Sequence, residues 1–195
     1  SQAKVSQCVD QVDYLVQMLQ IYNGNGTIDF SNDWKLLTVL TGANNICGSC
    51  TNGSIYKPEY FGRQLDMILS KVTAQIPRVF INVITMFNIS QVWNVHATQS
   101  YCNVMWDSFC NHECGCLTDS GSTNATRTAM DQHSVAFNQQ IYSVAAKYAA
   151  MKSPNFTVSV QPFTTNMLIQ DSDELSELDC FHPSLLANRG FAVGL

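Results

Sequence analysis

The sequence predicts an α/β protein with a parallel β-sheet and helices on both faces of that sheet. Three apolar runs rich in β-branched residues have the character of strands, and amphipathic segments with helical spacing precede or separate them. Strands that alternate with helices are joined by right-handed crossovers, and ligands gather at the carboxyl ends of such strands. The 195 residues, 46% of them hydrophobic, suit one compact domain over 1–195.

The first half of the chain predicts the order helix, strand, helix. Apolar residues recur at helical spacing over 5–19, and turn residues at 23–26 end that helix. The run KLLTVLTG at 35–42 is apolar and closes on a glycine, so we expect a strand that is buried on both faces. Pro58 suits the first position of a second helix, whose apolar stripe ends before Pro77.

The second half continues the pattern after an interruption. RVFINVIT at 78–85 predicts a second strand. The segment from there to about Thr126 has no period of its own, so we expect a long loop that is functional or stapled by disulfides. A third helix is predicted over 137–148 and is ended by Pro154, and FTVSVQPF at 156–163 predicts a third strand.

Composition argues against two classes of function. Charged residues make up 13% of the chain and the net charge is -5, so no basic surface for nucleic acid is expected. No apolar run approaches the roughly 18 residues of a membrane span, and the N-terminus has no apolar signal-peptide core. We therefore expect a mature protein or a fragment of one.

Cysteines and glycosylation triplets both indicate an oxidising, secretory compartment. The even number of cysteines favours disulfides over metal ligands, and the cluster at 102–116 suggests local bridges within one loop. The eight cysteines are Cys8, Cys47, Cys50, Cys102, Cys110, Cys114, Cys116 and Cys180. The five N-x-S/T triplets begin at Asn25, Asn52, Asn88, Asn124 and Asn155. We expect a glycoprotein that is secreted or resides in the lumen of the secretory pathway.

Two polar motifs fall where the predicted fold collects its ligands. In DCFHPS, Asp179 precedes His182 by three residues, so its carboxylate can accept the Nδ1–H hydrogen bond and leave Nε2 free as a general base. The structural alternative is a helix N-terminus with Asp179 near the cap and Pro183 in the first turn. In LTGANNIC, Asn44 is either an oxyanion donor or an ordinary turn residue.

These segments resemble the GDSL/SGNH hydrolase superfamily, and within it the eukaryotic phospholipase B group. DWKLLTVLTGANNIC is similar to block III of that group, G-x-N-D after a buried strand, with Gly42 and Asn44 at motif positions. DCFHPS is similar to block V, D-x-x-H, and matches it at Asp179 and His182. The resemblance covers nearly the whole chain and implies a three-layer, flavodoxin-like α/β/α sandwich.

The resemblance also implies a carboxylic ester hydrolase of the phospholipase B, lysophospholipase or lipase kind. In that role His182 is the base, Asp179 orients it, and the side-chain amide of Asn44 is an oxyanion donor. The implied substrate is a lipid or another ester, with peripheral contact to a lipid surface. No metal or organic cofactor is expected.

Three features depart from the family pattern. No G-D-S motif with a nucleophilic serine precedes a helix, and TDSGS lies in the cysteine loop after no strand, so Ser120 is not expected to be the nucleophile. SQAK aligns with a glycine-containing block II and places Gln2 where an oxyanion-hole glycine is expected, leaving only its backbone N–H as a donor. Asn45 replaces the aspartate of G-x-N-D.

The departures predict an incomplete hydrolase domain. The chain begins inside block II and stops within the family's final helix, so we expect a companion N-terminal segment to supply the first strands and the serine. Without those strands, the strand at 35–42 would present an unpaired apolar edge. The alternative is a catalytically inactive hydrolase fold that serves in binding or assembly.

Two cysteine motifs allow other interpretations. CGSC at 47–50 is similar to a thiol–disulfide site, but residues intervene after the strand, and we favour a structural bridge that braces the Asn44 loop. CNHECGC at 110–116 is similar to a zinc knuckle, but half-cystines are favoured in an oxidising compartment. The other histidines have no partner pattern and are expected at the surface or in loops: His96, His112 and His133.

Overall fold

A computed structural model describes residues 3–109 and 112–194 of the chain. Its sheet has three parallel strands in the order β1-β2-β3. The strands are β1 (Lys35–Val39), β2 (Val79–Ile84) and β3 (Phe156–Gln161). The predicted parallel α/β fold is confirmed, and each predicted strand is present in a slightly shorter form.

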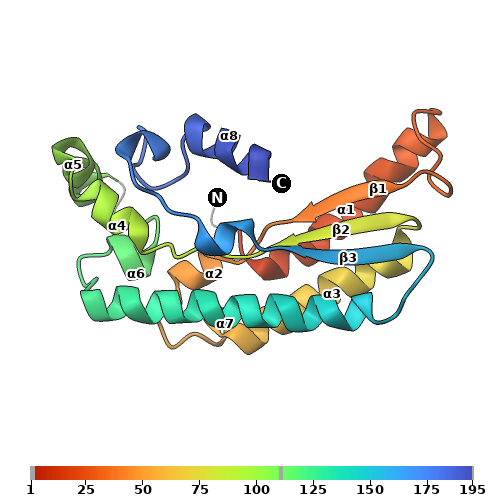
Figure 1. The fold of residues 1–195 in the computed structure, drawn as a ribbon, viewed down its shortest axis with the longest axis horizontal. Coiled ribbons are helices and arrows are strands. Elements are labelled where there is room, and N and C mark those ends of the chain that lie inside the picture. Colours follow the sequence, from red (N-terminus) through yellow and green to blue (C-terminus); the bar gives the residue numbers. More distant parts are fainter. Residues whose placement is uncertain (1–2, 110–111, 195) are drawn as a thin grey trace.

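Helices lie on both sides of this sheet. The long helices α1 (Val5–Gly24), α3 (Pro58–Gln75) and α7 (Asn124–Ala149) cover one side, and α8 (Leu185–Gly194) lies on the other side, beyond the carboxyl ends of the strands (Figure 1). Pro58 occupies the first turn of α3, where its missing N–H costs no hydrogen bond. The Thr123 hydroxyl accepts the Thr126 N–H at 3.2 Å, which caps α7 and starts it well before the predicted residue. The arrangement is a three-layer α/β/α sandwich.

The hydrophobic core lies between the sheet and the three long helices. Phe61 of α3 stacks on Phe137 of α7 with ring centroids 4.5 Å apart, and both side chains are fully buried. Leu37, Ile81 and Val158 share one register across the strands and belong to this core. Burying one such side chain contributes about 1.5–3 kcal/mol relative to leaving it exposed, so this layer holds the sheet in place.

The prediction that the 35–42 strand is buried on both faces is wrong. β1 is an edge strand in which half-buried and exposed residues alternate, and Leu36 is 72% exposed. Leu36 is in register with Phe80 and Thr157, and all three are exposed on the face opposite the core. A continuous apolar run predicts two covered faces. Among the described residues only one face of β1 is covered.

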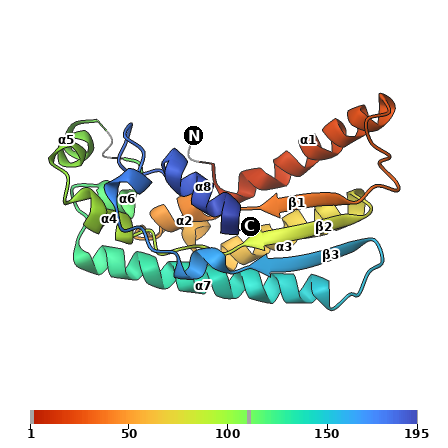
Figure 2. The ribbon, with the colours of Figure 1, turned by 45° about the horizontal axis from the view of Figure 1, so that its top comes forward.

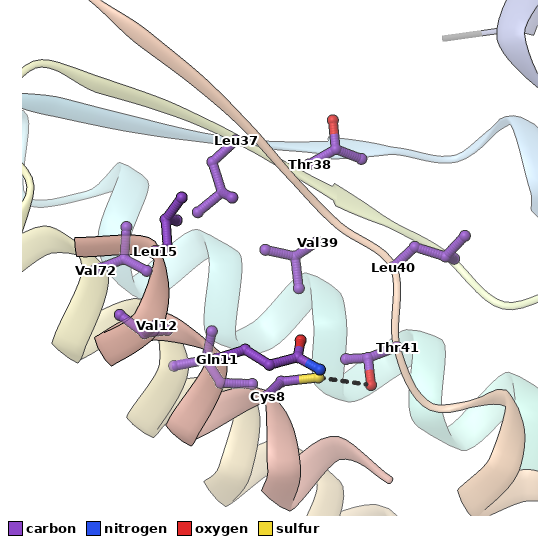
Figure 3. Close-up of a pocket in the computed structure, with 11 residues that line it drawn as sticks. Cys8, Gln11, Val12, Leu15, Leu37, Thr38, Val39, Leu40, Thr41 and Val72 are labelled. Atoms are coloured by element: carbon purple, nitrogen blue, oxygen red, sulfur yellow. Dashed lines mark hydrogen bonds between the residues drawn. The ribbon is translucent and has the colours of Figure 1, made fainter. Parts of the chain in front are cut away.

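A cavity of about 260 Å³ lies between α1, α3 and β1 (Figure 3). Leu37 and Val39 line it from the strand, and Val12 lines it from α1. The Cys8 thiol points toward Thr41 Oγ1 at 3.4 Å. The cavity therefore runs beside the sheet edge, away from Asp179 and His182.

The segment between β2 and α7 is not a structureless loop, contrary to our expectation. It contains three short helices, α4 (Gln91–His96), α5 (Ser100–Ser108) and α6 (Gly115–Thr118). They lie beyond the carboxyl ends of the strands, as does α2 (Ala43–Cys47) (Figure 2). These helices have six, nine and four residues, too few to display an apolar stripe that sequence periodicity could detect.

Short 3₁₀ helices complete the described chain. They are η1 (Ser54–Tyr56), η2 (Phe163–Asn166) and η3 (Ser172–Glu174). Phe163 of η2 contacts Phe191 of α8 edge to face, with centroids 6.5 Å apart, which fastens the last helix to the segment after β3. Among the described helices, none is both long enough and apolar enough to cross a membrane.

Three disulfides connect distant parts of the chain and indicate an oxidising compartment. They are Cys47–Cys114, Cys50–Cys116 and Cys102–Cys180, with sequence separations of 67, 66 and 78 residues. The expected local bridges within 102–116 are therefore wrong for the described cysteines. Cys102 lies on α5 and pairs with Cys180, and the CGC motif instead pairs with CGSC, beyond the carboxyl ends of the strands (Figure 2).

The remaining two cysteines stand apart from these bridges. Within the described residues Cys8 forms no disulfide, contrary to expectation, because it faces Thr41 on the strand β1 side of α1. Cys110 lies outside the described residues. The cysteines of CGSC do not pair with each other, although their two bridges to α6 do brace the Asn44 segment.

Candidate active site

Both predicted site motifs lie beyond the carboxyl ends of the strands. β1 leads through Gly42 into α2, which carries Asn44 and Asn45. β3 leads through η2 and η3 into the turn that carries Asp179 and His182, just before α8 (Figure 2). The parallel topology thus brings residues that are far apart in the sequence to the carboxyl ends of the strands.

Asp179 and His182 form a direct hydrogen-bonded pair. His182 Nδ1 lies 2.7 Å from Asp179 Oδ2, a short distance that is typical of a charge-assisted hydrogen bond. Asp179 Oδ1 also accepts the backbone N–H groups of Phe181 and His182 at 2.9 and 3.0 Å. One carboxylate therefore both closes the turn and orients the imidazole, so the structural and catalytic interpretations of this motif are compatible.

The pair sits at the surface with its carboxylate turned inward. The side chain of His182 is 55% exposed, whereas that of Asp179 is 18% exposed. Among the described residues, no hydroxyl group hydrogen-bonds to the His182 ring, so Nε2 is open to solvent or to a reacting group. This is the geometry of a base that is oriented from behind and accessible in front.

The pKa values of the pair move apart. The hydrogen bond from Asp179 raises the pKa of His182 above 6.5 despite partial burial, and the charge of Glu113 adds to the effect. Burial alone would raise the pKa of Asp179, but the hydrogen bonds from the His182 ring and from two backbone N–H groups outweigh it and lower that pKa. Asp179 is therefore ionised throughout the range in which His182 titrates.

The turn that carries the pair is pinned from several directions. Ser176 N–H donates to the His182 carbonyl at 2.7 Å, and Cys180 N–H donates to the Ser176 carbonyl at 2.8 Å. Cys180 itself has a φ of 54°, a left-handed conformation that costs a non-glycine residue about 1–2 kcal/mol. The Cys102–Cys180 disulfide and the Trp106 indole, which donates to the Asp179 carbonyl at 2.9 Å, hold this conformation.

Gly42 opens the second motif in a conformation that only glycine adopts readily. Its φ is 122°, and a Cβ at this position would lie 2.9 Å from the Phe61 ring. Its carbonyl accepts the N–H groups of Asn45 and Ile46, both at 2.9 Å, which starts α2. Gly42 therefore shapes the turn that presents Asn44.

Asn44 and Asn45 have different partners. Asn44 Nδ2 donates to the Ala3 carbonyl at 2.7 Å, and the second N–H of its amide remains available. Asn45 is fully buried; its Oδ1 accepts the Val5 N–H at 3.0 Å and its Nδ2 donates to the Ile55 carbonyl at 2.9 Å. Asn44 is thus placed at the surface of the site, whereas Asn45 joins three segments of the fold.

The structure does not bring Asn44 and His182 into contact. No hydrogen bond joins these two described residues. Asn44 lines a cavity of about 280 Å³ whose other wall includes Glu113, the carboxylate whose charge raises the pKa of His182. Glu113 is therefore close to both motifs. The expected oxyanion donor Gln2 lies outside the described residues.

Sequence reasoning missed two residues that contact this site. We had expected His96 at the surface or in a loop, but its side chain is buried. Burial lowers the pKa of His96. Its ring stacks on that of Trp106 with centroids 3.6 Å apart, and Trp106 contacts the Asp179 carbonyl. The HxxxxxCxxxW spacing over 96–106 carries no known signal, because the contact to Asp179 spans 73 residues of sequence.

The described residues give no support to the zinc or redox interpretations. In the part of the chain that the structure describes, no three His, Cys, Asp or Glu side chains are grouped so as to hold a metal ion. Two disulfides join the CGSC motif to the CGC motif and use all four of their cysteines: Cys47, Cys50, Cys114 and Cys116. Ser120 is exposed after α6, and the prediction that it is not the nucleophile stays a prediction.

The fold and this site define a three-layer α/β/α domain of the hydrolase class, with an oriented histidine in its last described loop and an asparagine turn after its first described strand. The GDSL-like lipase/acylhydrolase family model matches residues 3–193, and the chain belongs to this family. The name of the family describes lipases and acylhydrolases, which are enzymes that hydrolyse acyl esters.

Three curated relatives are similar to the chain, each called phospholipase B1, membrane-associated. The rat protein (Rattus norvegicus) is 24% identical over 187 residues, the mouse protein (Mus musculus) 23% over 188, and the human protein (Homo sapiens) 23% over 186. Each match covers 92% of this chain but only 13%, 12% and 13% of the respective relative. The chain thus spans a small part of the length of these relatives.

Proposed function

We propose that this chain carries the base and the oxyanion donor of a serine esterase that acts on lipid esters, of the phospholipase B, lysophospholipase or lipase kind. The observation that carries the proposal is the 2.7 Å contact between His182 Nδ1 and Asp179 Oδ2, with Nε2 accessible at the carboxyl-end edge of the sheet. The names of the three relatives support a phospholipid as the substrate.

The proposed reaction has two steps. A serine hydroxyl attacks the ester carbonyl while His182 Nε2 takes its proton, and the alcohol leaves with that proton. A water molecule then attacks the acyl-serine by the same route and releases the carboxylic acid. Asp179 holds the tautomer with Nδ1–H, and its negative charge stabilises the imidazolium that forms in each step. No metal or organic cofactor enters this reaction.

Asn44 is proposed to stabilise the oxyanion of the tetrahedral intermediate. One N–H of its amide is occupied by the Ala3 carbonyl, which fixes the orientation of the amide, and the other is free to donate. Gly42 contributes by shaping the turn, since its positive φ is closed to other residues. The backbone N–H of Gln2 is a weaker candidate for a second donor.

The nucleophilic serine is proposed to come from a companion N-terminal segment. Two features favour this: His182 has no hydroxyl partner among the described residues, and the outer edge of β1 has no neighbouring strand among them. A segment that pairs with β1 would continue the parallel sheet and end at the edge where His182 lies. Residues 1–195 would then form one part of a single hydrolase domain.

We also propose that the protein is a secreted or lumenal glycoprotein that makes peripheral contact with a lipid surface. The asparagines of all five N-x-S/T triplets are exposed, as glycosylation requires. The three disulfides support the same compartment. Enzymatic removal of N-linked glycans should lower the mass of the protein from its natural source; an unchanged mass would contradict the glycosylation proposal.

A serine-reactive fluorophosphonate probe on the intact source protein tests the esterase proposal. We expect covalent labelling that is strongly reduced in a His182→Ala variant, because the serine then loses its base. The second candidate function is binding or assembly by an inactive hydrolase fold, which Asn45 at the family's aspartate position favours. Absence of labelling under conditions that label a related lipase would decide for that candidate.

A further inference from the structure

An aromatic cluster lies against the turn that carries Asp179 and His182. The rings of His96 and Trp106 are stacked 3.6 Å apart at an interplanar angle of 9°. Trp93 packs against both, with centroids 5.1 and 5.9 Å away, and the Arg127 guanidinium lies 4.1 Å from the Trp93 ring. His96 and Trp106 are 4% and 3% exposed. A ring stacked and buried in this way is held in one orientation.

The Trp106 indole uses that fixed orientation to hold the turn. Its Nε1–H donates to the Asp179 carbonyl at 2.9 Å. Cys102, one helical turn earlier on the same face of α5, forms the disulfide with Cys180. Two residues of one short helix therefore hold two consecutive residues of the turn, one by a hydrogen bond and one by a covalent bond.

The direction of the Asp179 side chain depends on this hold. Its carboxylate must reach His182 Nδ1 with one oxygen while the other caps the N–H groups of Phe181 and His182. Both contacts require the backbone of Asp179 to keep one orientation next to Cys180, whose φ of 54° is sparsely populated. Such a conformation persists only where its surroundings impose it.

We propose that Trp106 is a positioning residue for the Asp179–His182 pair, acting through the backbone carbonyl of Asp179. It contacts neither the imidazole nor, in the proposed reaction, the ester; its indole N–H keeps the carboxylate aimed at Nδ1. The kinetic consequence rests on the proposed esterase function, but the effect on the pair itself does not.

The test removes the hydrogen-bond donor of Trp106 and compares the variant with an equally truncated neighbour. Trp106→Phe keeps an aromatic ring against His96 and removes the indole N–H. Trp93→Phe is the matched control, because it changes the same cluster by the same atoms and leaves the Asp179 carbonyl with its donor. Deuterium exchange at the imidazole carbon of the intact source protein, followed by mass spectrometry of the proteolytic peptide that contains His182, reports the pKa of His182 whether or not the protein turns over an ester.

We expect Trp106→Phe to lower the pKa of His182 toward its ordinary value and to reduce kcat about 3- to 10-fold, the size of one lost hydrogen bond, with KM almost unchanged. Trp93→Phe should leave both quantities near the wild-type values. If Trp106→Phe fails to fold, benzothienylalanine at position 106 removes the N–H and preserves the shape of the indole.

The outcomes separate this proposal from the esterase proposal. An unchanged His182 pKa in the Trp106 variant, or an equal shift in the Trp93 variant, overturns the positioning role. A selective shift in a protein that hydrolyses no ester would uphold the positioning role and overturn the proposed function. A selective shift together with the selective loss of kcat would uphold both.

Discussion

The two turns at the sheet edge are held in different ways. The turn from Gly42 to Asn45 is fixed from inside, by a positive-φ glycine against Phe61 and by a fully buried amide. The turn from Asp179 to His182 is fixed from outside, by a disulfide and an indole that α5 supplies. In the first turn, Asn45 holds the fold and its neighbour Asn44 is the proposed oxyanion donor. In the second turn, the Asp179 carboxylate both closes the turn and orients the imidazole.

Because of this difference, mutations should separate stability from catalysis in the first turn but not in the second. Asn45 hydrogen-bonds to two backbone groups from distant segments, so its replacement should lower the stability of the fold. Asn44 makes one hydrogen bond, to the Ala3 carbonyl, and its replacement should mainly lower the rate of catalysis. In the other turn, Asp179 cannot be altered without affecting both the turn and the imidazole. The variants below are ordered from the largest expected effect to the smallest.

His182→Ala should cause the largest loss, a fall in kcat of roughly 10⁴-fold or more, because it removes the proposed general base. The midpoint of thermal unfolding should hardly move, since the side chain is 55% exposed. Steady-state hydrolysis of a short-chain ester and a circular-dichroism melt measure the two quantities. Retained turnover in a folded variant would refute the assignment of the base.

Asn44→Ala should lower kcat about 10²–10³-fold, the effect typical of one missing oxyanion donor, with little change in stability. Asn103→Ala is a suitable control because Asn103 is exposed and lies on α5. The same ester assay measures both variants. Equal activity of the two would assign Asn44 to the turn alone and remove it from the chemistry.

Asn45→Asp should lower the free energy of unfolding by about 1–3 kcal/mol, although it restores the aspartate of the family motif. A carboxylate can still accept the Val5 N–H, but it cannot donate to the Ile55 carbonyl, and it places a charge at a fully buried position. Urea unfolding measures the change, with the exposed Asn103→Asp as control. A gain in stability would mean that the turn is built for a carboxylate.

The pH dependence of kcat/KM should show the smallest effect. The base must be neutral, so the rate should rise with pH through the pKa of His182, which Asp179 raises above 6.5. Asp179→Asn should also lower kcat strongly, but in its residual activity the loss of the negative charge should move this limb to lower pH, while Asp173→Asn, an exposed carboxylate nearby, should not move it. A limb that stays in place in Asp179→Asn would show that another group governs it.

The same pKa shift has a consequence for stability with a definite sign. Because the folded-state pKa of His182 is raised, the pair stabilises the fold most below pH 6.5 and loses this contribution as the pH rises through the folded value. The half-exposed position of His182 keeps the contribution modest. Activity and this part of the stability therefore change in opposite directions with pH.

Sequence alone was enough for the parts of the molecule that depend on local patterns. The long helices follow from apolar spacing, as the buried Leu65 and Leu69 of α3 illustrate, and the strands follow from runs of β-branched residues. The Asp179–His182 pair follows from its spacing, because three residues of a turn suffice to bring the side chains together.

Contacts between distant residues could not be read from the sequence. Eight cysteines allow 105 pairings, and no pattern distinguishes Cys102–Cys180 from the others. The exposed face of β1 was not predicted, because an apolar run in the sequence is the same whether or not a neighbouring segment covers it. The contact of the His96–Trp106 stack with the site was not predicted, because Trp106 hydrogen-bonds to Asp179, which lies 73 residues further along the chain.

The disulfide between Cys102 and Cys180 closes a loop of 78 residues, a constraint on the unfolded chain worth roughly 4–5 kcal/mol. Cys180 is made long after α5, so the turn can be fixed only after both segments have been synthesised and an oxidant is present. The orientation of Asp179 and His182 therefore depends on formation of this disulfide. Molecules in which Cys102 and Cys180 remain reduced would contain both residues but would not hold them in a fixed arrangement. Reduction under native conditions would release the histidine turn before the helical core, because the covalent link serves the former and apolar packing serves the latter.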